Sequence, residues 1–256
     1  MKKQIKKWTL RIVITGLFII GLLLLIILKP SLTYAYKTTH INYIIFHNKP
    51  FDQSLITHLD QATELVKKSE FYNPNLKLEI CLNDGSKYPV LMQKILGQSF
   101  AAGFYNKVVL HGMPNYKDNY VELNGYKWNL TQLLAHEVTH CLQFDNLGFW
   151  KSSPLGKIPT WKKEGYPEYI ARQNSDQTDL LKNIERLIEK QKTDKDNWGI
   201  SFADSTFVGK DYYGWWLLMQ YCMDIKKMTY KQVLKDTTTE TEIKKEMMNW
   251  YYKNHD

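Results

Sequence analysis

The longest run of apolar positions in the chain lies close to its start. Residues 10–28, LRIVITGLFIIGLLLLIIL, comprise 19 positions with a single charge, Arg11. A helix of that length crosses the hydrocarbon core of a bilayer, and a basic flank is typical of the cytoplasmic side. We therefore predict a cytoplasmic basic N-terminus over residues 1–11, a single-pass transmembrane signal anchor over residues 10–28, and a domain that lies outside the cytoplasm at the cell membrane.

A cleavable signal peptide is the alternative to an anchor. The sequence SLTYAY, which follows the apolar run, offers Thr33 and Ala35 as a small-residue cleavage site. The run is longer than the roughly 7 to 15 apolar residues that are usual in signal peptides, so we favour the anchor. Cleavage would instead release a secreted form, and in both cases the domain is extracytoplasmic.

After the apolar run, the spacing of hydrophobic residues alternates between the period of a strand and that of a helix. After a linker over residues 29–39, alternation with a period of two predicts short strands, and apolar positions three and four apart predict helices. In chain order the predicted elements are strand 41–48, helix 52–69, strand 76–82, helix 88–96, strand 103–112, and helices 129–144, 179–192 and 211–227, with a loop over 193–207. The pattern indicates one α+β domain over residues 40–256, in which a small mixed sheet precedes a mostly helical half.

Composition supports a folded core and narrows the classes of partner. The chain is 44% hydrophobic and 14% aromatic, which is typical of a globular protein. Five of its positive charges precede residue 12, so the net charge of +8 falls to 29 − 26 = +3 over the rest of the chain. This balance argues against a nucleic-acid-binding surface. The three cysteines, Cys81, Cys141 and Cys222, are scattered, so we expect buried apolar residues, and one disulfide remains an alternative.

The helix predicted over residues 129–144 carries the clearest chemical signal. Its segment LLAHEVTHCLQFD places His136 and His140 four positions apart, with Glu137 beside the first histidine. Histidines at this spacing project from one helix face, so both rings reach one metal ion. The glutamate then lies near the open coordination position, where a carboxylate takes a proton from water. The motif indicates catalytic zinc, which needs a third protein ligand.

Residues 158–171, IPTWKKEGYPEYIA, offer that third ligand. The segment resembles the P-x-W-x-x-E-G-x-A-E-Y sequence of gluzincin metallopeptidases, members of the peptidase MA-like superfamily. The resemblance implies a zincin-like metallopeptidase fold, with Glu164 as the third zinc ligand, 23 intervening residues after His140.

Glu168 lies one helical turn beyond Glu164 and would accept the free ring N–H of His136, which fixes the tautomer of that ligand. The sequence departs from the family pattern at Pro167, where alanine is usual. Proline is tolerated only in the first turn of a helix, so the helix is expected to start late. A late start counts against the predicted contact of Glu168 with His136 more than against metal ligation by Glu164. A solvated acidic helix face is the alternative for both glutamates.

Two further features follow from the resemblance. The strand GFYNKVVLHG, residues 103–112, corresponds to the edge strand on which the family binds the substrate backbone, although an ordinary core strand is the alternative. Related aminopeptidases carry G-x-M-E-N here, and this chain lacks that glutamate, which favours an endopeptidase. Downstream, the segment DYYGWWLLMQYC resembles the helix that presents an oxyanion-stabilising tyrosine, which implies that role for Tyr212, with Tyr213 or a purely structural tyrosine as the alternatives.

The sequence therefore predicts a membrane-anchored zinc endopeptidase that acts on a peptide or protein substrate. Two alternatives remain open. One is a non-catalytic interaction module that keeps the same fold. The other is a closed structural metal site with a fourth protein ligand, for which His111 is the nearest candidate. The sequence leaves the oligomeric state undetermined.

Overall fold

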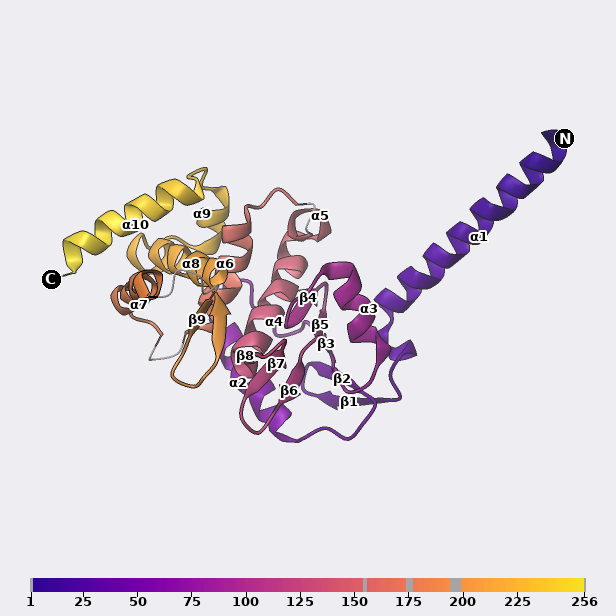
Figure 1. The fold of residues 1–256 in the computed structure, drawn as a ribbon, viewed down its shortest axis with the longest axis horizontal. Helices are drawn as coiled ribbons and strands as arrows, with labels where there is room; N and C mark the ends of the chain where they lie inside the picture. Colours follow the sequence, from indigo (N-terminus) through magenta and orange to yellow (C-terminus); the bar gives the residue numbers. More distant parts are fainter. Residues whose placement is uncertain (1, 154–155, 174–176, 194–198, 256) are drawn as a thin grey trace.

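A computed structural model of the chain describes residues 2–153, 156–173, 177–193 and 199–255 (Figure 1). Its first element is α1 (Lys2–Leu28), which extends away from the rest of the molecule. Within α1, the stretch Trp8–Leu28 has a mean hydropathy of 2.8, and none of its most apolar window is buried. By length and composition this helix could cross a membrane or act as a signal sequence.

The first half of the domain is built on a five-stranded sheet. Three central strands run parallel, and an antiparallel strand lies at each edge. Across the sheet the order is β1 (Tyr36–His40), β2 (Tyr43–His47), β3 (Leu78–Cys81), β5 (Lys107–Leu110) and β4 (Ala101–Phe104). The crossover from β2 to β3 contains α2 (Ser54–Val66), and α3 (Lys87–Leu96) follows β3.

Successive side chains of the central strands point to opposite faces of the sheet, and both faces are covered. One set, which includes Ile45, Ile80 and Val108, packs with α2 into the main core. The alternate set consists of Phe46, Cys81 and Val109. It forms a smaller cluster with Tyr34 and with Tyr88 and Met92 of α3. Ile26 and Ile27, at the end of α1, pack against this cluster. The end of α1 is therefore packed against the domain.

A second, antiparallel sheet leads into the central helix of the domain. It comprises β6 (Met113–Asn115), β7 (Tyr120–Leu123) and β8 (Tyr126–Asn129), and α4 (Leu130–Leu147) begins directly after it. Asn129 caps α4 by accepting a hydrogen bond from the Gln132 N–H, as expected for a good N-cap. The Gln132 side chain donates to Gln177 instead of returning to the cap, so the reciprocal half of a capping box is not formed.

The second half is mainly helical. Its helices are α5 (Phe149–Ser152), α6 (Thr160–Ala171), α7 (Leu180–Thr193), α8 (Lys210–Gln220), a π-helical turn η2 (Tyr221–Ile225), α9 (Tyr230–Lys235) and α10 (Glu240–Asn254). A small hairpin of β9 (Gly199–Ser201) and β10 (Phe207–Gly209) precedes α8. Helices α6 and α8 approach closely because Gly165 has no side chain, and a Cβ at that position would meet the Trp215 carbonyl.

The mixed α and β architecture and the apolar N-terminal helix confirm the coarse prediction. Two element predictions were wrong. The run 103–112 is not one strand, because Tyr105 takes a left-handed conformation and the chain reverses into a β4–β5 hairpin. The loop predicted over 193–207 contains β9 and the start of β10, while residues 194–198 lie outside the described chain. Within residues 29–39, predicted as a linker, the structure has a short 3-10 turn (Pro30–Leu32) and most of β1.

Candidate metal centre

Helix α4 carries two histidines and a glutamate into the interior of the domain. Every residue from 130 to 143 is buried, since the helix is packed between the strands of the two sheets, α2, α5 and α6. His136, Glu137 and His140 are each less than a tenth exposed, and one ligand atom from each lies within 4.8 Å of the others. This buried group could bind a metal ion.

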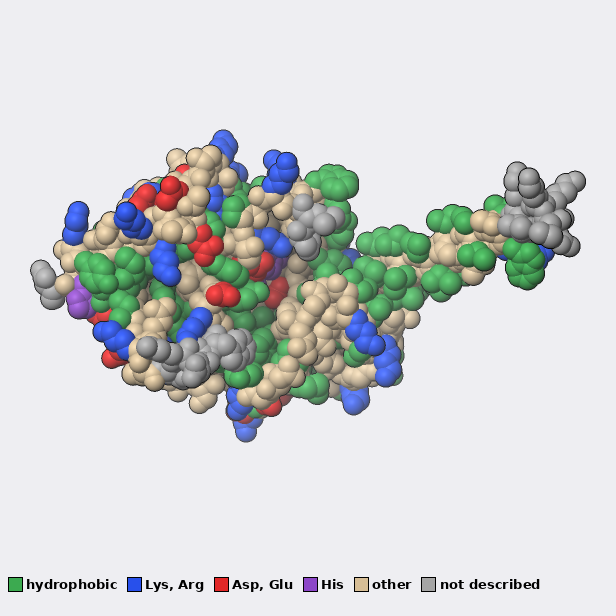
Figure 2. Space-filling model, turned by 45° about the horizontal axis from the view of Figure 1, so that its top comes forward, with side chains coloured by type: hydrophobic (Ala, Val, Ile, Leu, Met, Phe, Trp, Pro, Cys, Tyr) green, Lys and Arg blue, Asp and Glu red, His purple; other side chains and the backbone are tan. Residues whose placement is uncertain are grey.

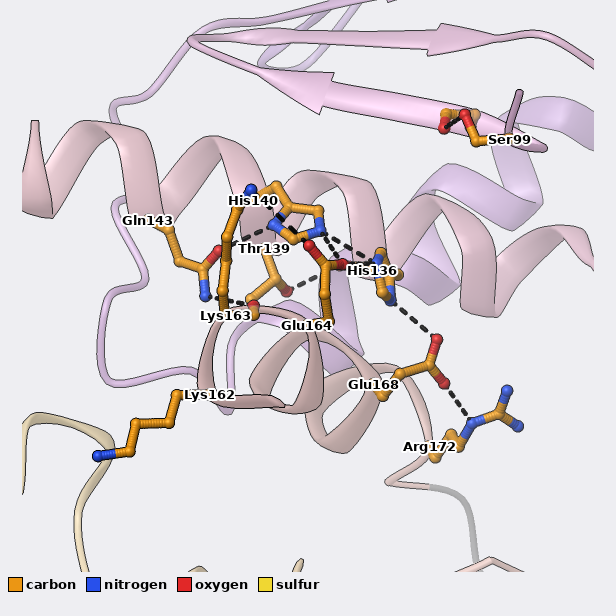
Figure 3. Close-up of polar contacts among 12 residues, drawn as sticks. Ser99, His136, Thr139, His140, Gln143, Lys162, Lys163, Glu164, Glu168 and Arg172 are labelled. Atoms are coloured by element: carbon orange, nitrogen blue, oxygen red, sulfur yellow. Dashed lines mark hydrogen bonds and ion pairs between the residues drawn. The ribbon is translucent and has the colours of Figure 1, made fainter. Parts of the chain in front are cut away.

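Helix α6 brings Glu164 to the same point. Its Oε2 atom is 3.1 Å from Nε2 of His140 and 3.6 Å from Nε2 of His136, while the two Nε2 atoms are 3.1 Å apart (Figure 3). Ligand atoms about 2.0–2.1 Å from a tetrahedral ion are separated by roughly 3.3–3.4 Å. The three atoms thus have the spacing of three ligands around one ion. Glu137 also lies near both imidazoles, but the contacts of Glu164 with both Nε2 atoms make Glu164 the better third ligand.

The opposite ring nitrogens have acceptors of their own. Nδ1 of His136 is 3.0 Å from Oε1 of Glu168, within ion-pair distance, and neither atom has a hydrogen-bond partner. Nδ1 of His140 is 2.8 Å from Oε1 of Gln143. Both partners are acceptors, so once a ring is neutral, as a metal ligand must be, its remaining proton belongs on Nδ1 and the lone pair of Nε2 points inward. Two converging lone pairs beside a carboxylate are a donor set that fits a cation.

Glu168 is in turn fixed by a buried arginine. Nε of Arg172 donates to Oε2 of Glu168 over 2.6 Å, and both side chains are about 1% exposed. The guanidinium also donates to Gln132 and lies 5.1 Å from the ring centroid of Trp216. Arg172 therefore neutralises the charge of Glu168 and holds its second oxygen, which leaves the first oxygen for His136.

Pro167 does not delay the start of α6, contrary to the expectation from sequence. The helix begins at Thr160 and continues through the proline to Ala171. Proline has no N–H for the carbonyl four residues earlier, and that carbonyl, on Lys163, accepts a hydrogen bond from Nε2 of Gln143 instead. The same amide group thus satisfies the interrupted helix and orients His140. Because α6 is intact, Glu168 lies one turn after Glu164 and reaches His136.

The pKa values of His136, Glu164 and Glu137 are shifted by burial and by one another's charges. Burial lowers the pKa of His136, but hydrogen bonds with Glu164 and Glu168 outweigh burial, so the net pKa is raised. Burial acts to raise the pKa of Glu164, whereas the charges of His140 and His136 hold it well below its usual range. For Glu137 burial dominates and raises the pKa, with a smaller opposing effect from the histidines and from the Gly103 N–H.

The group opens onto a cleft with a volume of about 480 Å³. This volume is typical of a ligand-binding site. The cleft is lined by His136, Glu137, His140 and Glu164 and by all four residues of β4. Strand β4 is an edge strand, and within the described residues it pairs only with β5. It lies directly against α4, because a Cβ on Gly103 would overlap the Glu137 carbonyl.

The two tyrosines singled out from sequence have different positions. Tyr212 lines the cleft, with its ring 6.0 Å from the ring of His136 and next to Trp128. Its pKa is raised by burial and by the nearby Glu164, Glu137 and Glu168 carboxylates, so the phenol keeps its proton. Tyr213 is buried elsewhere and donates to the Asn183 carbonyl.

His111 does not join the group. It lies at the end of β5, where Nδ1 contacts Ser99, and it does not line the cleft. Sequence reasoning missed Gln143, Arg172 and Trp128. The first two were readable as positions three residues after His140 and four residues after Glu168 on predicted helices. Trp128 had no such signal. All three cysteines are free and buried, as expected.

A scan against protein-family models found no matching family, and a search of curated proteins found no matching relative.

Proposed function

We propose that this chain is a zinc-dependent metallopeptidase of zincin-like fold that hydrolyses peptide bonds outside the cytoplasm, attached to the cell membrane by α1. The observation that carries the proposal is the convergence of two Nε2 atoms and one carboxylate oxygen beside a second buried glutamate, at the wall of a cleft. The HExxH motif and the following W-x-x-E-G segment support the gluzincin type.

Zinc fits this donor set better than a hard cation does. Magnesium and calcium prefer oxygen ligands, whereas two imidazoles and one carboxylate are a set used by catalytic zinc. His136, His140 and Glu164 would hold the ion, and Glu168 and Gln143 would orient the two rings. When bound, zinc polarises the scissile carbonyl and lowers the pKa of water to about 7.

Glu137 is the proposed general acid and base. It accepts a proton from the attacking water and later delivers that proton to the leaving amine. A carboxyl group with a raised pKa suits both steps, because a pKa nearer to neutral pH lets the group both accept and release the proton. The Gly103 N–H of β4 acts to lower this pKa and so partly offsets the effect of burial. The protonated phenol of Tyr212 lies on the same cleft and would donate a hydrogen bond to the developing oxyanion.

The substrate backbone would pair with β4. An extended peptide adds to a free sheet edge through main-chain hydrogen bonds, and β4 presents that edge within the cleft. No glutamate of the aminopeptidase type stands on β4, so the proposal specifies cleavage within a chain rather than at a free N-terminus.

The variant Glu137→Gln tests the proposal, since it keeps the shape of the side chain and removes the base. Hydrolysis of internally quenched peptides, blocked at both ends, should fall by at least about 10²-fold. Zinc content and thermal stability should change little. Glu64→Gln on the exposed face of α2 is the matched control.

Three outcomes would contradict parts of the proposal. Equal hydrolysis by the wild type and Glu137→Gln would remove the mechanism. Cleavage confined to peptides with a free N-terminus would overturn the endopeptidase assignment. A wild type that loads zinc and cleaves no peptide in a broad library would favour a non-catalytic interaction module.

A further inference from the structure

Among the described residues, six large apolar side chains are exposed on α3, on α5 and in the β4–β5 turn. We call this group the anchor-side patch. Its residues are Val90, Ile95 and Leu96 of α3, Tyr105 in the β4–β5 turn, and Phe149 and Trp150 of α5. Trp150 is 78% exposed. Figure 2 shows hydrophobic side chains along α1 and on the part of the domain nearest to it. Apolar side chains gathered in this way mark an interaction site more often than chance exposure.

The patch is continuous with the membrane-spanning candidate helix. Ile26 and Ile27 of α1 pack against the same small cluster that Phe104 covers. From Phe104 the aromatic contacts continue to Tyr105, whose ring stacks on Phe149 at 5.8 Å, and then to Trp150. A chain of apolar contacts thus leads from α1 across the face of the domain.

The joint between α1 and the domain is fixed by hydrogen bonds. The Tyr88 hydroxyl donates to the Ile27 carbonyl over 2.7 Å, and the Ser86 hydroxyl donates to the Thr33 carbonyl. The first contact holds the end of α1 against α3, and the second holds the turn that follows α1. In Figure 1, α3 adjoins the base of α1, and α5 lies on the same side of the domain. A bilayer crossed by α1 would therefore face both helices.

Four lysines lie on or beside the elements that carry the patch and α1. Lys29 follows α1, Lys87 and Lys94 lie on α3, and Lys151 lies on α5, all exposed. Neither α3 nor α5 contains an acidic residue. Aromatic side chains beside lysines are the composition of a membrane interface, where rings sit at the headgroup level and ammonium groups meet phosphates.

We propose that the anchor-side patch rests on the surface of the bilayer that α1 crosses, so that the domain docks on the membrane with one orientation. The cleft has Leu96 and Phe104 among its lining residues, and both belong to this side of the domain. One end of the cleft therefore opens at the lipid surface. Resting on the proposed peptidase function, this orientation specifies the substrate class as an extended segment of a membrane-attached polypeptide close to the bilayer.

The depth of two matched spin labels tests the docking without any need for hydrolysis. Trp150→Cys on α5 and Tyr252→Cys on α10 are compared in the full chain, reconstituted in vesicles of phosphatidylcholine with phosphatidylglycerol. Tyr252 is 69% exposed and belongs to α10, the helix at the end of the molecule far from α1. The native cysteines are buried, so the labelled wild type gives the background.

The Trp150→Cys label should show high accessibility to dissolved oxygen and low accessibility to a water-soluble nickel complex, and the Tyr252→Cys label the reverse. Equal exposure of both labels to the nickel complex would overturn the proposal. Dipolar broadening between Trp150→Cys labels that persists when protein is diluted in lipid would also overturn it, because the patch would then join two copies of the chain.

The substrate class has its own readout. The wild type should cleave a peptide attached to the vesicle lipid at least about 10-fold faster than the same peptide in solution, and Trp150→Ser should reduce this ratio while leaving hydrolysis of the soluble peptide unchanged. A soluble peptide cleaved as fast as the attached one would overturn the substrate class alone. Failure to cleave either peptide would refute the peptidase function and the substrate class with it, whereas the labels would still decide the docking.

Discussion

Glu164 and Glu168 lie one turn apart on α6 and both contact His136, but their surroundings differ. Glu164 faces the cleft and contacts the Nε2 atoms of both histidines. Glu168 is enclosed, with Arg172 on one oxygen and Nδ1 of His136 near the other. The first is placed to bind a metal, and the second to hold the ring that binds it.

The two glutamates should therefore fail in different ways. Glu168→Gln leaves the Arg172 charge uncompensated in the interior, and breaking a buried pair costs about 3–5 kcal/mol of stability. Glu164→Gln removes one of the two carboxylates beside His136, but that ring can lose its proton whereas Arg172 cannot, so unfolding in denaturant with a chelator present should change less. In metal titrations, Glu164→Gln should lower the metal affinity by more than the roughly 10- to 100-fold that is typical when a residue that only orients a ligand is changed. Unchanged metal affinity in Glu164→Gln would remove that residue from the site.

Metal binding should also depend on pH through His136. Its raised pKa means that the metal-free protein retains the ring proton at neutral pH, and this proton stabilises the metal-free fold until pH rises through the raised pKa. A metal ligand must be neutral, so binding should release about one proton. The apparent affinity should weaken as pH falls from 8 to 6. Calorimetry in buffers of different ionisation enthalpy measures the release, and buffer-independent heats would contradict the prediction.

At the scale of elements, the contact between α6 and α8 sets the position of Glu164. Gly165 makes that contact, because a Cβ there would meet the Trp215 carbonyl, whereas a Cβ on Gly214 of α8 would meet nothing within 4 Å. Gly165→Ala should force the helices apart, lower the melting temperature and weaken metal binding. Gly214→Ala, the matched control, should stabilise the protein by roughly 0.5–1 kcal/mol, the usual gain for this change within a helix. Equal effects of both changes on thermal unfolding would contradict this account.

The sequence predicted those elements whose signals are local. Asn129 marked the start of α4, and the spacing of His136 and His140 placed them on one face, because both depend only on helix geometry. The site contacts made across α6 were harder to predict. The role of Pro167 depended on a carbonyl that Gln143 satisfies from another helix. The reversal at Tyr105 required a left-handed residue without glycine or asparagine at that position, so the strand boundary left no pattern in the sequence.

At the scale of the whole molecule, the residues around the cleavage site predicted as an alternative are part of the fold. Tyr34 is buried, its ring stacks on Phe46, and its hydroxyl donates to the Leu82 carbonyl. Cleavage after Ala35 would remove this residue from the small cluster and also remove the α1 contacts of Tyr88. We therefore expect the mature protein to retain α1. N-terminal sequencing of protein extracted from membranes checks this, and a start at Tyr36 would contradict it.

If the chain is the proposed membrane-anchored peptidase, the hydrogen bonds that fix α1 and the following turn to α3 also affect which bond is cut. A domain on a flexible tether samples many heights above the bilayer, whereas Tyr88 and Ser86 allow only a narrow range. The metal centre would then stay at a constant elevation over the lipid. A polypeptide that emerges from the same membrane would meet it at a set number of residues from its own point of exit. Selection of the bond would thus depend on distance along the substrate as well as on side chains.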